Sequence, residues 1–121
     1  MEYTLNAVRV YVTDWERSVE FYSKTLGMPV LFEGAEMGWA ELDTGPAHLA
    51  LERVDPTDEE GAELLGRFVS VSLRVEDIRA TYETLRSRGV DFLEPPEVQP
   101  WGGVLAHFRD PDDNVLTLLG E

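Results

Sequence analysis

The feature that most constrains this fold is a strand-and-helix plan that occurs twice, about sixty residues apart. The first copy reads VTDWERSVEFYSKTLGM, residues 12–28, and the second reads LRVEDIRATYETLRSRGV, residues 73–90. Each copy joins the end of an alternating strand to an acidic helix start, an apolar stripe at helical spacing and a final glycine. A repeated plan of this kind predicts two halves built on one architecture.

In the first half, residues 5–12 alternate as expected for a strand with one buried face. Valines at 8, 10 and 12 point one way, and Ala7, Arg9 and Tyr11 point the other way. Thr13 and Glu16 form a T-x-x-E capping box that predicts a helix, which ends at Gly27. Three short strands are expected to follow, near residues 29–33, 38–42 and 47–53.

Residues 55–67 are acidic and break the strand pattern, so we interpret them as a linker with one helical turn at 59–65. The plan then repeats with a strand at 69–75, a helix that begins at Asp77 and ends at Gly89, and three strands. These last strands are expected near residues 91–94, 104–109 and 115–119. We therefore expect a single domain, 1–121, in which module one covers 1–54 and module two covers 68–121.

The composition is acidic and lacks cysteine. The chain has 24 acidic and 10 basic residues, a net charge of −14 and no cysteine. This charge repels phosphate backbones and attracts cationic small molecules, so we expect no nucleic-acid partner. The start of the chain does not resemble a signal peptide, and no apolar run is long enough to cross a bilayer. We expect a soluble, cytoplasmic protein with no membrane partner.

The first copy, taken with WGGVLAHFRDPDDNVLTLL at 101–119, resembles the vicinal oxygen chelate superfamily of glyoxalases, bleomycin resistance proteins and extradiol dioxygenases. The resemblance covers nearly the whole chain and rests on D-x-x-x-S-x-x-F-Y-x-x-x-L-G and D-P-D-x-N. It implies an α+β fold in which two βαβββ modules form an open, curved sheet around a cleft. Asp113 stands where the family often has glycine. Because aspartate tolerates a left-handed conformation, we expect the turn to be kept.

The same resemblance implies four inward positions at which metal-dependent members carry histidine, glutamate or glutamine. Here these positions hold Ala7, Ala50, Ser70 and Thr117. Alanine has no ligand atom, and neutral hydroxyls are weak ligands for a divalent ion. We therefore expect no metal site. The absence of a G-x-G-x-x-G motif or a P-loop likewise predicts no nucleotide cofactor.

Strand alternation and the PWGG loop together suggest a set of ligand-binding residues: Arg9, Tyr11, Trp39, Glu41, His48, Glu52, Ser72, Arg74, Trp101, Leu105 and His107. Aromatic faces with a few polar groups are typical of pockets for organic molecules. His48 and His107 are the candidate acid–base groups. Structural roles remain open as alternatives: an Arg9–Glu52 ion pair, a histidine satisfied at a sheet edge, and a tryptophan that anchors a turn.

We therefore expect a metal-independent small-molecule binding protein that sequesters an antibiotic or metabolite. The ligand is expected to be cationic or aromatic, and the resemblance to bleomycin resistance proteins implies a homodimer. An alternative is a metal-independent enzyme that uses the histidines for proton transfer and Arg9 or Arg74 to hold an anion. A third possibility is a regulatory or assembly module whose cleft binds nothing.

Overall fold

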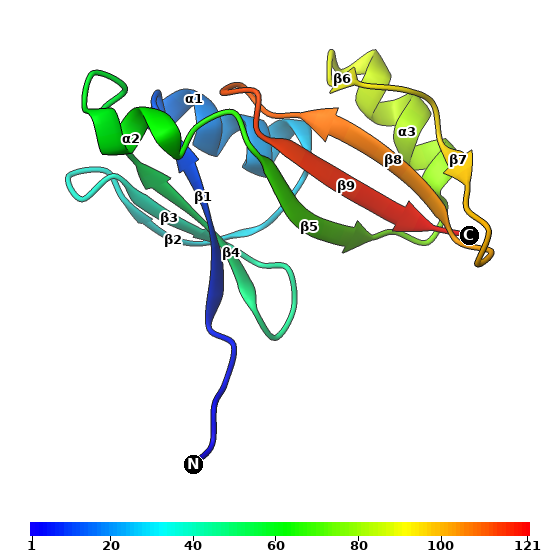
Figure 1. Cartoon of the computed structure of the whole chain (residues 1–121), viewed down its shortest axis with the longest axis horizontal. Coiled ribbons are helices and arrows are strands. Elements are labelled where there is room, and N and C mark those ends of the chain that lie inside the picture. Colours follow the sequence, from blue (N-terminus) through cyan, green and yellow to red (C-terminus); the bar gives the residue numbers. More distant parts are fainter. The chain divides into compact units, whose positions relative to one another are not determined.

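Both predicted copies of the strand-and-helix plan are present in the computed structural model, which describes all 121 residues. Residues 1–65 form one compact unit and residues 66–121 form the other (Figure 1). Each unit pairs a sheet with a helix, and neither sheet closes into a barrel. The α+β class predicted from the sequence is therefore confirmed. None of the helices has both the length and the apolar character needed to span a bilayer.

The first unit is built on a four-stranded sheet in the order β1-β4-β3-β2. Its elements are β1 (Ala7–Val12), α1 (Trp15–Glu20), a π-helical turn (Phe21–Thr25), β2 (Val30–Gly34), β3 (Trp39–Leu42), β4 (His48–Arg53) and α2 (Glu59–Glu63). β1 and β4 are parallel, whereas β2–β3 and β3–β4 are antiparallel. One face of this sheet, together with α1 and the turn after it, makes the core. Its buried side chains are Val10, Val12, Trp15, Val19, Tyr22, Ala40, Leu42, Leu49 and Leu51.

The first helix differs from its prediction at both ends. Its N-cap is Asp14, whose carboxylate accepts from the Arg17 N–H at 3.2 Å, so the helix begins one residue later than a Thr13 cap predicts. At its other end, the Leu26 N–H bonds to the Phe21 carbonyl at 2.9 Å, which is the spacing of a π-helix. The Ser23 hydroxyl donates to the Val19 carbonyl at 2.6 Å and so competes for an acceptor of the helix.

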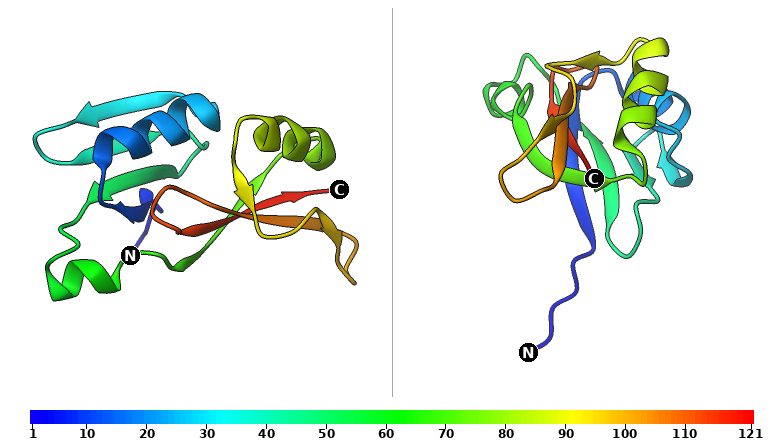
Figure 2. Two further views of the ribbon diagram at one scale, coloured as in Figure 1. Left: turned by 90° about the horizontal axis from the view of Figure 1, so that it is seen from above. Right: turned by 90° about the vertical axis from the view of Figure 1, so that its right-hand side faces the viewer.

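The second unit repeats the plan, with a sheet in which β5, β9, β8 and β6 are neighbours and β7 also pairs with β8. Its elements are β5 (Phe68–Arg74), α3 (Ile78–Ser87), β6 (Asp91–Phe92), β7 (Glu97–Val98), β8 (Val104–Arg109) and β9 (Val115–Gly120). Figure 2 shows α3 lying on one face of this sheet. The strand predicted near residues 91–94 is present but shorter, because β6 covers only Asp91–Phe92, and β7 was not predicted. Pro95 and Pro96 cannot donate ladder hydrogen bonds, and pairing resumes only at Glu97.

The turn between β8 and β9 depends on the buried carboxylate of Asp110, which is 5% exposed. Its Oδ1 accepts from the backbone N–H groups of Asp112 and Asn114, both at 2.9 Å. Its Oδ2 accepts from the Asn114 side-chain amide at 2.9 Å. Asp113 takes the left-handed conformation, with φ of 64°, as the sequence predicts. Asp110 and Asn114 therefore hold this turn, as expected.

We predict that Asp110→Ala lowers the free energy of unfolding by about 3 kcal/mol, because it leaves buried donors without an acceptor. Asp113→Asn is the matched control, since asparagine also tolerates the left-handed conformation; its effect should stay within about 0.5 kcal/mol. Urea unfolding followed by circular dichroism measures both. Equal midpoints for Asp110→Ala and the unmodified protein would contradict this role of the carboxylate.

Candidate functional site

Strand register in the first unit gathers polar and aromatic side chains on the sheet face opposite α1. Arg9, Ala50, Glu41 and Phe32 pair across the four strands in one row, and Tyr11, Glu52 and Trp39 pair in the next. Paired residues in a sheet point to the same side. These residues, with Ala7 and His48 at the end of the β1–β4 ladder, make up the polar face of the first-unit sheet.

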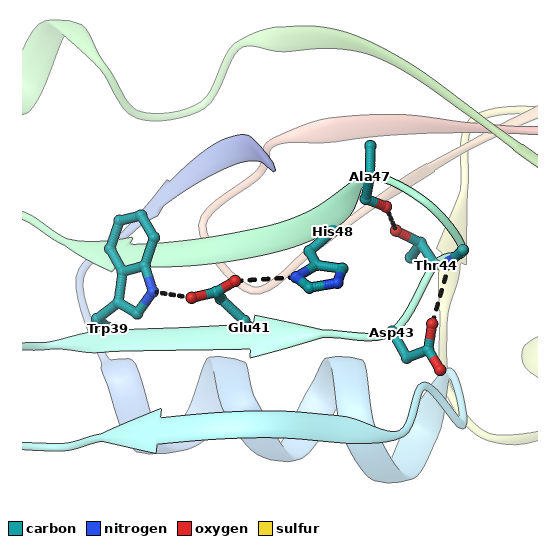
Figure 3. Close-up of polar contacts among 7 residues, drawn as sticks. Trp39, Glu41, Asp43, Thr44, Ala47 and His48 are labelled. Carbon is teal, nitrogen blue, oxygen red and sulfur yellow. Dashed lines mark hydrogen bonds and ion pairs between the residues drawn. The ribbon is translucent and has the colours of Figure 1, made fainter. Parts of the chain in front are cut away.

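Three side chains of the polar face form a hydrogen-bonded chain (Figure 3). The indole Nε1–H of Trp39 donates to Glu41 Oε2 at 3.0 Å, and His48 Nδ1 lies 2.9 Å from Glu41 Oε1. Trp39 and Glu41 are two residues apart on β3, so both point to the same side. We call Trp39, Glu41 and His48 the Glu41 triad.

The turn between β3 and β4 places His48 diagonally across from Glu41, which pairs with Ala50 (Figure 3). The Thr44 hydroxyl donates to the Ala47 carbonyl at 2.7 Å, and the Gly45 N–H donates to the Asp43 carboxylate at 3.1 Å. Gly45 has a φ of 107°, a conformation that residues with a Cβ rarely adopt. Local hydrogen bonds thus fix the turn that sets the β3–β4 register.

Hydrogen bonds to Glu41 stabilise its charged form. The bond from His48 is the main cause that lowers the pKa of Glu41 below its ordinary value, and the bond from Trp39 is the second. Partial burial acts in the opposite direction but does not cancel them. Since an ionised carboxylate only accepts, His48 Nδ1 must carry the proton that it shares with Glu41. The other ring nitrogen, Nε2, is then the acceptor when the imidazole is neutral.

A second polar pair lies beside the triad. Arg9 Nη1 is 3.3 Å from Glu52 Oε1, and the Arg9 guanidinium lies 5.7 Å from the centre of the Tyr11 ring. The Arg9 side chain is 54% exposed and that of Glu52 is 32% exposed. The Arg9–Glu52 ion pair that the sequence left open as a structural alternative is therefore present. Because exposed ion pairs contribute little to stability, we expect it to add little to the free energy of unfolding.

An open pocket of about 610 Å³ lies on this side of the first unit. Its lining residues are Phe32, Met37, Trp39, Glu41, Glu52 and Arg53. Phe32, Met37 and Arg53 were not among the residues predicted from the sequence. An irregularity between Val30 and Phe32 in the β2–β3 pairing turns Phe32 to the Glu41 side, so simple alternation along β2 cannot assign it. Phe32 and Met37 are exposed apolar side chains.

The second unit has its own row of candidate residues. Ser72 pairs with Thr117, and Thr117 pairs with His107, whose Nδ1 is 2.8 Å from the threonine hydroxyl. The Phe68 ring contacts the His107 ring edge-on, with centroids 5.5 Å apart. Either partner of the His107–Thr117 contact can be the donor, so this contact does not fix the imidazole tautomer.

The remaining candidates of the second unit lie apart from His107. Arg74 pairs with Leu119, which pairs with Leu105, in the next row of the sheet. Trp101 is 65% exposed in the loop before β8, and its ring lies against Gly103, where a Cβ atom would come within 2.0 Å of it. The Trp101 ring therefore packs on the backbone of its own loop.

The residues at the four implied metal positions do not suit a divalent ion. Ala7 and Ala50 have no ligand atom, and the Thr117 hydroxyl is already bonded to His107. Ser70 has a φ of 63° and lies in an irregular stretch of β5, so Ser72 takes its place opposite Thr117. No group of three histidine, aspartate or glutamate side chains in the structure is arranged to hold a metal ion.

Comparison with known proteins gives a consistent result over nearly the whole chain. Residues 4–118 match the family described as the Glyoxalase/Bleomycin resistance protein/Dioxygenase superfamily. The chain is 34% identical over 119 residues to the uncharacterized protein YraH of Bacillus subtilis (strain 168), covering 92% of this chain and 93% of that protein. It is 29% identical over 113 residues to a bleomycin resistance protein of Klebsiella pneumoniae, covering 88% and 83%.

A solved structure extends this result to the fold. A member of the glyoxalase/bleomycin resistance protein/dioxygenase superfamily from Sphaerobacter thermophilus DSM 20745 matches with a TM-score of 0.81 and 32% identity. The match covers 100% of this chain and 98% of the other.

We predict that the stabilisation supplied by the Glu41 triad depends on pH. The pKa of Glu41 is lowered in the folded state, so its contribution is full above the ordinary glutamate pKa of about 4.3 and is lost as pH falls through the lower folded value. Glu41→Gln should therefore cost about 1 kcal/mol at pH 7 and less at pH 3, which lies below the ordinary pKa of glutamate.

Urea unfolding at the two pH values measures this difference. Glu33→Gln is the matched control, because Glu33 is exposed on the same sheet and pairs with Ala40 rather than with the triad. A cost of Glu41→Gln that stays constant from pH 7 to pH 3 would contradict the assignment.

Proposed function

Because the chain belongs to the glyoxalase/bleomycin resistance protein/dioxygenase superfamily, we propose that it is a metal-independent small-molecule binding protein. The guest lies on the polar face of the first-unit sheet. The observation that carries this proposal is the pocket of about 610 Å³, which combines two aromatic rings and a thioether with two carboxylates and the Arg53 guanidinium. Apolar walls with a few fixed polar groups are the usual make-up of a site for an organic molecule.

The proposed guest is an aromatic or cationic molecule. Trp39 and Phe32 provide ring faces for stacking, and Met37 is an adaptable apolar contact. Glu41 and Glu52 provide negative charge beside those rings, and the net charge of −14 favours the approach of a cation. The similarity to a bleomycin resistance protein supports an antibiotic or a related metabolite as the guest and sequestration as the role.

Metal independence is part of the proposal. It is supported by the donor set: the implied metal positions hold two alanines, a serine and a threonine whose hydroxyl is bonded to His107. Binding then relies on stacking and charge rather than on a metal–ligand bond.

A second copy of the chain is also part of the proposal. β2 is an edge strand of the first-unit sheet, and its apolar residues Val30, Leu31 and Phe32 are all exposed. A run of exposed apolar residues on an edge strand favours coverage by a partner. Homodimers are what the resemblance to bleomycin resistance proteins implies.

A second candidate function, a metal-independent enzyme, is favoured by one observation. His48 is oriented by a carboxylate that is itself held by Trp39, which is the arrangement of a positioned acid–base group.

We predict that bleomycin or a planar aromatic cation at a hundred times its dissociation constant stabilises the fold by about 2.7 kcal/mol. A thermal-shift assay with and without EDTA measures this, and EDTA should not reduce the shift. Trp39→Ala should weaken binding about tenfold, because a stacking or cation–π contact contributes about 1 kcal/mol or more. Glu33→Gln should bind normally.

The sequestration proposal fails if these compounds never raise the melting temperature while acids without an aromatic ring do so. A panel in which no small molecule has any effect would instead favour the assembly-module alternative.

A further inference from the structure

We propose that the turn between β2 and β3, residues 35–38, carries the specificity-determining wall of the guest pocket, and that Arg53 is the positioning residue that holds this turn. This role rests on the proposed function, because it requires a guest in that pocket. It deepens that function by selecting, among cationic guests, those that carry a flat aromatic ring.

A glycine leaves space beside the Trp39 indole. Gly34 pairs with Trp39 across the β2–β3 ladder. Paired residues stand on the same side of a sheet, so the neighbour of the indole on β2 has no side chain. A Cβ atom at Gly34 would lie 2.7 Å from Met37 Cε and 3.0 Å from Phe32 Cε2. The Met37 methyl and the Phe32 ring therefore meet at Gly34, and we call these two side chains the Met37–Phe32 wall.

The Met37–Phe32 wall faces the proposed guest. Both of its side chains and Trp39 line the pocket of about 610 Å³. A ring stacked on the indole extends over Gly34, where no side chain blocks it, and its edge then meets the wall. Thioether and ring-edge contacts with an aromatic group are favourable. A cation without a ring gains only the negative charge of the carboxylates, so the wall favours aromatic guests.

Arg53 bonds the turn at three points. Its Nη1 donates to the Ala35 carbonyl at 3.3 Å, and its Nη2 donates to the Glu36 carbonyl at 3.4 Å. The backbone N–H of Arg53 donates to the Gly38 carbonyl at 2.7 Å. Met37 lies between the residues that are bonded in this way, so Arg53 fixes the position from which the Met37 side chain enters the pocket.

The turn also packs closely on the aliphatic part of Arg53. A Cβ atom at Gly38 would lie 2.7 Å from Arg53 Cβ, and Gly38 has a φ of 65°, a conformation that favours glycine. Glycine thus allows the backbone of the turn to approach the arginine. The turn is therefore held by packing as well as by hydrogen bonds.

The charge of Arg53 suggests a competing role, which is to repel cations from the pocket. Both acceptors of its guanidinium are neutral carbonyl oxygens, and no carboxylate forms an ion pair with it. Arg53→Lys separates the two roles. Lysine keeps the positive charge but lacks the planar fork that bonds two carbonyls in a fixed geometry.

The test measures the dissociation constants of two cations by isothermal titration calorimetry with the full chain. Ethidium is a planar aromatic cation, and tetrapropylammonium is a cation without a ring. Arg53→Lys should raise the Kd of ethidium about fivefold, which corresponds to the loss of one apolar contact, and should leave the Kd of tetrapropylammonium unchanged. A role through charge alone predicts that neither Kd changes.

Gly34→Ala reaches the Met37–Phe32 wall without touching Arg53. Gly34 is not among the residues with positive φ, so the strand backbone accepts alanine. The new Cβ must displace the far ends of two flexible side chains. The Kd of ethidium should again rise about fivefold, and the urea midpoint should stay close to that of the unmodified protein.

Arg109→Lys is the matched control for the arginine substitution. Arg109 is a partly exposed arginine of the second unit, and its guanidinium bonds to Asp91 at 3.0 Å. This variant should bind both cations normally.

A measurement without a guest tests the wall itself. In protein labelled with ¹³C at the methionine methyl groups, three residues contribute: Met1, Met28 and Met37. The Met37 signal should differ from that of the exposed Met1, because the Phe32 ring lies beside its methyl group. Both wall-directed substitutions should move it toward the Met1 position and leave the Met28 signal unchanged.

Two results would overturn the proposal: an ethidium Kd that Arg53→Lys leaves unchanged, or a Met37 methyl signal that neither substitution moves. Failure of the proposed function is a different outcome, in which neither cation binds the unmodified protein. The assignment of an aromatic guest then falls with it, and the methyl signal alone decides whether Arg53 holds the turn.

Discussion

The hydrogen bond between Glu41 and His48 organises the proposed site. This bond joins side chains of the neighbouring antiparallel strands β3 and β4. The same carboxylate also accepts a hydrogen bond from the Trp39 indole, so Glu41 holds two other side chains in place. The pKa of Glu41 is lowered because the hydrogen bond from His48 and then the one from Trp39 stabilise its charged form more than partial burial opposes it. A metal ion is one way to fix the side chains of a site on a sheet. Here a carboxylate with two donors does so.

The two-residue period of the strands explains how much of this could be predicted from the sequence. The valines of β1 fixed which side of that strand faces the core, so Arg9 and Tyr11 were assigned to the polar face and lie there. The helix-ending glycines Gly27 and Gly89 were likewise predicted and both have positive φ values. Regular periodicity is a local property, and local properties can be read from one sequence.

The contacts inside the site could not be predicted in the same way. Trp39, Glu41 and His48 were each candidates, but their mutual bonds depend on the β3–β4 register, which the turn at Asp43–Ala47 sets through its own hydrogen bonds. Phe32 lies on the pocket side because the β2–β3 pairing is irregular between Val30 and Phe32. The left-handed Ser70 and the π-helical turn after α1 are similar cases, because both depart from the regular periods on which the sequence predictions rest.

The central claim is that this sheet binds an organic guest without a metal. Native mass spectrometry of freshly purified protein tests it most directly. Bleomycin is added to two samples, one untreated and one treated with EDTA. The account predicts a chain that carries no stoichiometric divalent ion and an equal amount of guest adduct in both samples. A stoichiometric zinc, iron, nickel or manganese ion, whose removal abolishes the adduct and whose return restores it, would contradict the account.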